Sequence, residues 1–331
     1  MCYTARGPRN RRSRYNPMKK LLSISDDPWS IHRLGGPEAV AAAVAENGFD
    51  GIELMRWHDP QPVSGVRIVG RHMPYWPTCL DFMRGDEQKL LRQFDNADNA
   101  LQYYSASSLD DFVKQRRAEL QETVEMGAEY AVYHISHAEL EHCYTHAFAY
   151  SDEEIVRAFI ELINEETAGL DGDVALLFEN HWFPGLKLTD TALTEALMAD
   201  VKYPCKGFVL DISHMMLADG VKTEPEAVNA ILKNIENLGD MAAYIRTIHL
   251  NSAAGAQPSE MDYHAQAPYE TRLTEAFRYV GSIDPHKPFQ DVGIQRVIEA
   301  AQPDYLVYEL AFSTQRELSR VVKQQDRALG Y

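Results

Sequence analysis

The sequence predicts one α/β domain with the architecture of a TIM (β/α)8 barrel, and three observations support the prediction. Short apolar segments alternate with segments that carry helix signals, which is the order of a repeated βα unit. Several apolar segments end on a carboxylate or a histidine, as expected where buried parallel strands open to solvent. At 331 residues, the chain is long enough for a barrel of roughly 250 residues with insertions.

Eight segments are predicted as strands because each is a short apolar run, which is typical of a strand covered on both faces. They are residues 19–25, 49–55, 66–73, 129–135, 175–179, 207–211, 247–251 and 305–310. Since no low-complexity linker divides the chain, residues 18–331 are predicted to form a single barrel.

Helices are predicted between the strands from apolar spacing and from end signals. Pro37 suits the first turn of a helix that ends near Gly48, and Ser151 with Glu154 forms a capping-box pattern before the helix 151–168. The other predicted helices are 86–94, 108–126, 189–199, 224–237, 239–246, 292–300 and 313–328. The stretch 252–290 is too long for an ordinary βα loop, so it is predicted to be an insertion over the active-site end, where it could form a lid or a homodimer interface.

Residues 1–17 contain five arginines and no apolar core, which predicts a basic disordered extension rather than a signal peptide. A nucleic-acid-binding arm is the alternative for this segment. The net charge is −17, and it becomes −22 without those arginines, so nucleic acid is disfavoured as a partner of the remaining chain. The scattered cysteines and the absence of an apolar run of about 20 residues predict a cytoplasmic protein with reduced thiols and no membrane span.

The candidate site residues are ionisable side chains at strand ends, which meet at one end of a parallel barrel. The strongest candidates for metal ligands are Glu179, Asp211, His249 and Glu309. His214, three residues after Asp211, is placed to reach the same point, and His134 and His72 end two further strands. His181 is expected in a loop near the rim or the surface.

Two Asp-x-His pairs follow the seventh strand, Asp262 with His264 and Asp284 with His286. The second pair is preferred because it directly precedes the helix 292–300 and the last strand, which places it better for reaching back into the mouth of the barrel. These oxygen and nitrogen ligands, without sulfur, suit Mn²⁺, Zn²⁺, Fe²⁺, Co²⁺ or Mg²⁺, with Mn²⁺ or Zn²⁺ favoured and one to three ions expected. Such a centre can support proton transfer next to a polarised carbonyl, or attack of water on a phosphate.

The order of the segments FEN, LDISH, IHLN and YEL resembles the xylose-isomerase-like TIM-barrel superfamily, from about Lys19 to Glu309. This superfamily includes sugar isomerases and epimerases of the tagatose 3-epimerase type, and endonuclease IV. Similarity to the epimerases implies one ion at the four strongest candidates. In that case Glu179 and Glu309 act as an acid/base pair and His214 holds a substrate hydroxyl. The arginine that those enzymes carry after the seventh strand is missing from NSAAGAQPSE.

Similarity to endonuclease IV implies a fuller ligand set with several ions. That set adds His72, His134, His214 and an Asp-x-His pair to the four strongest candidates. Arg56, Arg71 and Lys287 are candidates to bind one phosphate, and Asn180 and Asn251 are further candidates for substrate contacts.

The favoured hypothesis is therefore a divalent-metal-dependent isomerase or epimerase that acts on a sugar-like small molecule by proton transfer. The first alternative is an endonuclease-IV-like phosphoesterase. The second alternative is a metal-binding barrel without catalysis.

Overall fold

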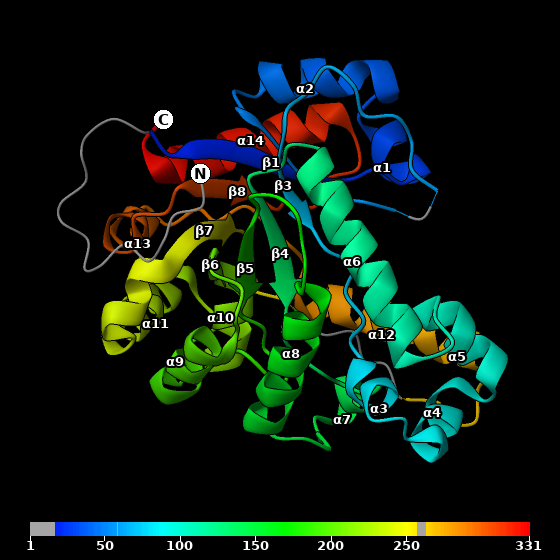
Figure 1. The fold of residues 1–331 in the computed structure, drawn as a ribbon. Coiled ribbons are helices and arrows are strands. Elements are labelled where there is room, and N and C mark those ends of the chain that lie inside the picture. The colour runs from blue at the N-terminus through cyan, green and yellow to red at the C-terminus, as the bar shows by residue number, and fades with distance from the viewer. Residues whose placement is uncertain (1–16, 58, 257–262) are drawn as a thin grey trace.

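The computed structural model describes residues 17–57, 59–256 and 263–331. Eight parallel strands form a closed barrel in chain order, with the last strand paired to the first (Figure 1). The strands are β1 (Lys19–Ser25), β2 (Gly51–Met55), β3 (Ile68–His72), β4 (Tyr130–His134), β5 (Ala175–Glu179), β6 (Lys206–Asp211), β7 (Ile245–Leu250) and β8 (Tyr305–Tyr308). The predicted TIM barrel is confirmed.

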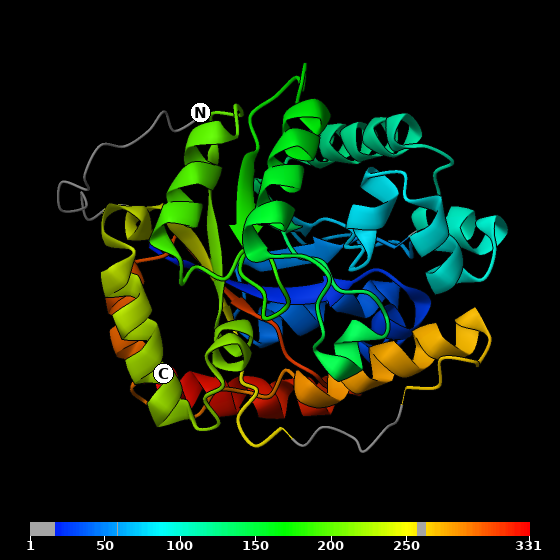
Figure 2. The ribbon, with the colours of Figure 1, turned by 90° about the horizontal axis from the view of Figure 1, so that it is seen from below.

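Helices surround the barrel and follow the strands along the chain (Figures 1 and 2). They are α1 (Pro28–Arg33), η1 (Pro37–Ala39), α2 (Val40–Glu46), α3 (Cys79–Met83), α4 (Glu87–Phe94), α5 (Ala97–Tyr104), α6 (Leu109–Glu125), α7 (His142–Thr145), α8 (Asp152–Glu166), α9 (Thr191–Asp200), α10 (Ile212–Asp219), α11 (Glu224–Asn237), η2 (Gly239–Tyr244), α12 (Tyr269–Ile283), α13 (Ile294–Ala301) and α14 (Gln315–Leu329). The capping box of Ser151 and Glu154 is present at the start of α8. No helix of the described segments is both long and apolar enough to cross a membrane.

Several helices differ from the sequence prediction. Short helices such as α1 and α10 follow strands directly and begin on an aspartate cap, Asp27 and Asp211 respectively, whose carboxylate accepts backbone N–H bonds. Helix α12 occupies much of the stretch 252–290, for which the sequence signals predict no helix. It packs beside α7 at the C-terminal end of the strands, where the rings of Tyr144 and Tyr279 stack at 4.5 Å.

The alternation of side chains along the strands determines which of them point into the barrel at its C-terminal end. Leu177 and Val209 belong to an inner apolar core that fills the barrel. Because side chains on a strand alternate with a period of two, Glu179 and Asp211, two residues further on, also point inward, at the C-terminal end. The apolar side chains of the opposite parity, such as Phe178 and Leu210, pack against the helices in a larger outer core.

Candidate metal centre

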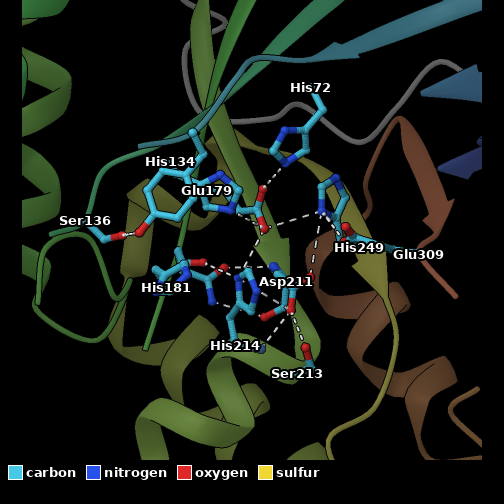
Figure 3. Close-up of polar contacts among 12 residues, drawn as sticks. His72, His134, Ser136, Glu179, His181, Asp211, Ser213, His214, His249 and Glu309 are labelled. Atoms are coloured by element: carbon cyan, nitrogen blue, oxygen red, sulfur yellow. Dashed lines mark hydrogen bonds and ion pairs between the residues drawn. The ribbon is translucent and has the colours of Figure 1, made fainter. Parts of the chain in front are cut away.

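Nine buried or partly buried side chains form three of the candidate ligand groups at the C-terminal end of the barrel, and Figure 3 shows the first two of them together with His214 of the third. Within each group the candidate ligand atoms lie within 4.8 Å of one another. The groups are His72, His134 and Glu179; Glu179, Asp211, His249 and Glu309; and His214, Asp284 and His286. Glu179 belongs to the first two groups, so its two oxygens can serve two neighbouring ions.

The first group lies at the ends of β3, β4 and β5. His72 Nε2 is 3.5 Å from Glu179 Oε2, and His134 Nε2 is 3.4 Å from Glu179 Oε1. His72 Nδ1 is 3.1 Å from the carbonyl of Met73, which can only accept a hydrogen bond. The proton of neutral His72 is therefore on Nδ1, and the lone pair of Nε2 faces Glu179.

The middle group surrounds His249 on β7. Its Nδ1 lies 3.1 Å from Glu309 Oε2, 3.5 Å from Glu179 Oε1 and 3.8 Å from Asp211 Oδ2. On the other side of the ring, Nε2 is 3.1 Å from Oε1 of Glu53, and Tyr130 Oη donates to Oε2 of Glu53. Nε2–H of His249 thus donates to Glu53, and the lone pair on Nδ1 is left to bind an ion.

Glu53 is not among the site residues predicted from the sequence. It is fully buried in β2, and its segment FDGIELM reads as an ordinary apolar strand with one acid in its middle. A buried carboxylate without a cationic partner is costly, so an acid inside an apolar strand was the available signal.

The third group contains the preferred Asp-x-His pair. His214 Nδ1 donates to the carbonyl of Asn180 at 2.9 Å, so the lone pair of Nε2 faces Asp284 Oδ2 at 3.3 Å. His286 Nε2 lies 3.0 Å from the same oxygen, and Ser213 Oγ donates to Asp284 Oδ1. His286 has a φ of 45°, an uncommon conformation for a residue other than glycine that often marks a functional site.

The other Asp-x-His pair does not join the centre. His264 is 63% exposed at its side chain, and its Nδ1 pairs with Glu275 at 3.3 Å. Asp262 lies outside the described residues.

The charges of the centre are strongly coupled. Burial raises the pKa of Asp211 to about 6. Burial also disfavours the charged form of His286, but Asp284 and Glu309 outweigh it and raise the pKa of His286 to about 10. Burial opposes ionisation of Glu309 as well, yet His249 and His286 hold the pKa of Glu309 at about 2. The carboxylates thus create a site for positive charge.

The unpaired atoms of the centre fit a metal ion. Glu179 Oε2, Glu309 Oε2 and His249 Nδ1 are buried and form no hydrogen bond within the described part of the chain. Glu179 Oε2 faces His72 in the first group, whereas Glu309 Oε2 and His249 Nδ1 face each other in the middle group. Buried acceptors are rarely left without a partner. Carboxylate oxygens and imidazole nitrogens are the ligands that Zn²⁺, Mn²⁺ and Fe²⁺ take in proteins.

Two predicted substrate contacts have a different role in the structure. Asn180 is fully buried, its Oδ1 accepts from Asp211 N at 2.8 Å, and its Nδ2 donates to Asp211 O. Asn251 donates from Nδ2 to Asp211 Oδ2 at 2.9 Å and accepts from Ser213 N at 3.0 Å. Their amide groups orient Asp211 and the start of α10 instead of facing a substrate.

Arg71, predicted to bind substrate, does not reach the centre. His72 points into the barrel, so its neighbour Arg71 points outward. The Arg71 guanidinium is buried under α6, where it donates to the carbonyl of Glu119 and to Glu122 Oε2 at 2.8 Å. Arg56 also pairs with Glu122, at 3.2 Å.

Lys287, the remaining phosphate candidate, donates to the carbonyl oxygens of Ala254 and Gly255, each at 3.3 Å. The structure therefore does not assemble the predicted trio of Arg56, Arg71 and Lys287 around one point.

A further cluster of Asp81, His137 and Glu139 lies outside the three groups. Lys89 Nζ is 3.3 Å from Asp81, and Arg92 is 2.6 Å from Glu139, so the two carboxylates already have cationic partners. Leu80 N donates to His137 Nδ1, which places the proton of the neutral ring on Nε2. These contacts make the cluster an ion-pair network, not a second candidate metal site.

Comparisons with known proteins agree with this architecture. The sequence model of the family described as xylose isomerase-like TIM barrel matches residues 41–291. The structure of 3-keto-D-glucoside 4-epimerase from E. coli is similar with a TM-score of 0.54 at 12% identity, covering 95% of this chain and 100% of that one. A xylose isomerase domain containing protein from Salmonella typhimurium gives 0.51 at 14% identity, covering 94% and 97%. No curated protein sequence matches significantly.

Proposed function

Because the chain belongs to the xylose isomerase-like TIM-barrel family, we propose that it is a divalent-metal-dependent enzyme, and specifically a hydrolase of phosphate esters in small molecules. The family contains sugar epimerases and isomerases, which supports an enzymatic role. The observation that carries the finer proposal is the presence of three adjacent ligand groups, two of which share Glu179.

Charge compensation favours several ions over one. The centre contains five carboxylates: Glu53, Glu179, Asp211 and Asp284 are buried, and Glu309 is partly buried. One divalent ion leaves a surplus of negative charge, which would repel an anionic substrate. Three ions with neutral histidines give a small surplus of positive charge, which suits a phosphoryl group and is not needed for a neutral sugar.

The side chains of the centre would bind the ions and orient the substrate. Divalent ions bound there would neutralise phosphoryl oxygens and lower the pKa of water, as in other multinuclear phosphoesterases. Glu53 and the carbonyls of Met73 and Asn180 fix the histidine tautomers. Glu309 is the most exposed of the ligand carboxylates, with 15% of its side chain accessible, so substrate would approach over it and its carboxylate could exchange a proton.

A small phosphate ester fits the chain better than nucleic acid. The net charge of −17 opposes a polyanion, and Arg71 lies on the outer side of the barrel instead of at its mouth.

The isomerase or epimerase hypothesis remains the second candidate, and the middle group supports it. Glu179, Asp211, His249 and Glu309 alone can hold one ion, and Glu179 and Glu309 would then flank a substrate carbon. This hypothesis gives no role to Asp284 and His286. It also expects His214 to face a substrate hydroxyl, whereas His214 Nε2 faces Asp284.

The change Asp284→Asn separates the two candidates. It preserves the volume of the side chain but removes the carboxylate of the third group. For a multinuclear phosphoesterase we expect the variant to lose about one ion per chain by elemental analysis and at least about a hundredfold in hydrolysis of phosphoesters. For a one-ion isomerase, metal content and turnover of ketoses would be unchanged.

His264→Gln is the matched control, because His264 is the exposed histidine of the other Asp-x-His pair. Wild-type protein with one ion per chain and activity on ketoses would contradict the hydrolase proposal.

A further inference from the structure

His181 lies against two of the proposed metal ligands. One ring nitrogen of His181 is within 4.8 Å of ring nitrogens of His134 and His214, so the three residues have the composition of a three-histidine metal site. From the sequence, His181 was expected in a loop near the rim or the surface; it lies in the loop after β5 but is buried, with only 4% of the residue exposed. Figure 3 shows it beside His214 in the centre.

A backbone hydrogen bond fixes the tautomer of His181. The N–H of Phe183 donates to His181 Nδ1 at 3.1 Å. A backbone N–H can only donate, so Nδ1 must carry a lone pair and the ring proton must be on Nε2. This is the reverse of His72 and His214, whose Nδ1 atoms donate to carbonyls and leave Nε2 free to bind an ion.

Packing holds the ring of His181 in this orientation. The ring of Trp182 stacks on it at 4.0 Å with an interplanar angle of 19°, and the ring of Phe183 lies at 5.1 Å. The ring centroid of Tyr75 lies 5.6 Å from that of His181. Turning the ring over would leave the buried N–H of Phe183 without an acceptor, which is unfavourable for a buried donor.

The free nitrogen of His181 is therefore a donor. Nε2 has no hydrogen-bond partner among the residues that the structure describes, and its proton prevents it from binding an ion while Nδ1 accepts from Phe183. Nε2 of His181 can therefore donate a hydrogen bond to an oxygen atom that lies next to the ions.

We propose that His181 is a substrate-binding residue that donates from Nε2 to an oxygen of the phosphoryl group, and that it is not a metal ligand. The identity of the oxygen rests on the proposed hydrolase function, while the exclusion of His181 from the metal ligands rests on the Phe183 hydrogen bond alone. Phe183 fixes the donor, and Trp182 holds its direction.

The test compares three variants of the metal-loaded protein by elemental analysis and by titration calorimetry with inorganic phosphate. His181→Ala should keep the wild-type number of ions and bind phosphate roughly tenfold to a hundredfold more weakly, since hydrogen bonds to charged acceptors contribute about 1.5–3 kcal/mol. His181→Gln, whose amide can still donate, should recover part of the loss. His214→Ala should lose metal and serves as the contrasting variant.

The outcomes that overturn the proposal are distinct. Loss of an ion from His181→Ala would make His181 a ligand, and unchanged phosphate binding would remove its role as a donor. If wild-type protein failed to bind phosphate at all, the anionic substrate itself would be wrong, and the assignment of His181 to a phosphoryl oxygen would fail with it. Phosphate binding that depends on His181 without any phosphoesterase turnover would contradict only the hydrolase function.

Discussion

The carboxylate of Glu53 lies 3.1 Å from Nε2 of His249, deep inside the barrel. This contact turns Nδ1 of His249 toward Glu179 and Glu309. A carboxylate behind a histidine fixes the orientation of the ring and increases its basicity as a ligand. The contact therefore connects β2, a strand with a mostly apolar sequence, to the middle ligand group.

Glu53→Gln should weaken metal binding at the middle group without unfolding the barrel. The amide keeps the shape of the side chain but removes the charge that orients His249, and such changes cost about 10–100-fold in metal affinity. Competition with a metal-binding dye measures the effect. Tyr130→Phe, which removes the hydroxyl that donates to Glu53, should have a smaller effect in the same direction. Equal metal affinity in Glu53→Gln and wild type would show that Glu53 does not orient the ligand.

Glu309→Gln should abolish turnover and leave the protein folded. Glu309 follows β8 at the open end of the barrel, so the change does not touch the apolar core. Loss of an acid/base carboxylate typically costs about 10²–10⁴-fold in rate. Steady-state kinetics and the melting temperature should be measured together, with Glu299→Gln on the exposed face of α13 as control. Substantial residual activity would mean that Glu309 was assigned wrongly.

Removal of metal should destabilise the protein. Without cations the buried carboxylates of the centre keep only histidine protons as compensation, and ions bound to the native state stabilise it by mass action. Dialysis against a chelator should lower the melting temperature by about 5 °C or more, and added Zn²⁺ or Mn²⁺ should restore it. Asp284→Asn should show a smaller shift because it binds fewer ions. A melting temperature that chelation leaves unchanged would contradict a loaded centre.

The strand-end ligands could be predicted because two regularities coincide. Buried strands are apolar, and the period of two along Leu177 and Glu179 directs the acid into the barrel. The same period could have excluded Arg71, since it adjoins the inward-facing His72. Residue type alone was the wrong guide there, because it suggested a phosphate contact for any arginine near a strand end.

Other features depended on contacts between distant segments. The burial of His181 results from its packing against Tyr75, His134 and His214, which come from other segments, and no local pattern encodes those contacts. Both Asp-x-His pairs have the same residue types, and the sequence could only prefer Asp284 and His286 by their position before β8. Helix α12 lies within a stretch that its length had suggested to be an insertion.

Gly70→Ala should disturb the centre from within the barrel. A Cβ at Gly70 would lie 2.2 Å from the ring of Tyr130, which would have to move. Because Tyr130 donates to Glu53, and Glu53 orients His249, the displacement should reach the middle ligand group. We expect a loss of stability of roughly 1–3 kcal/mol, as for other overpacked cores, together with weaker metal binding. Gly281→Ala, where a Cβ meets no atom within 4 Å, is the control, and equal effects of both changes would contradict this chain of contacts.

Glu166 should make the stability of the protein depend on pH. Its carboxyl is buried, lies 3.5 Å from Arg116 Nε and accepts a hydrogen bond from Tyr133 Oη at 3.1 Å. Burial raises the pKa of Glu166 more than these two partners lower it, so the pKa rises from 4.5 to about 7. The folded state therefore binds a proton that the unfolded state releases above about pH 4.5, so this contribution to the free energy of unfolding is full below that pH and is lost as the pH rises to about 7. Glu166→Gln should remove this loss, on the order of 2 kcal/mol, in urea denaturation at pH 5 and pH 7.5. The same pH dependence in both proteins would mean that Glu166 is ionised in the fold at pH 5, and that Arg116 compensates its burial.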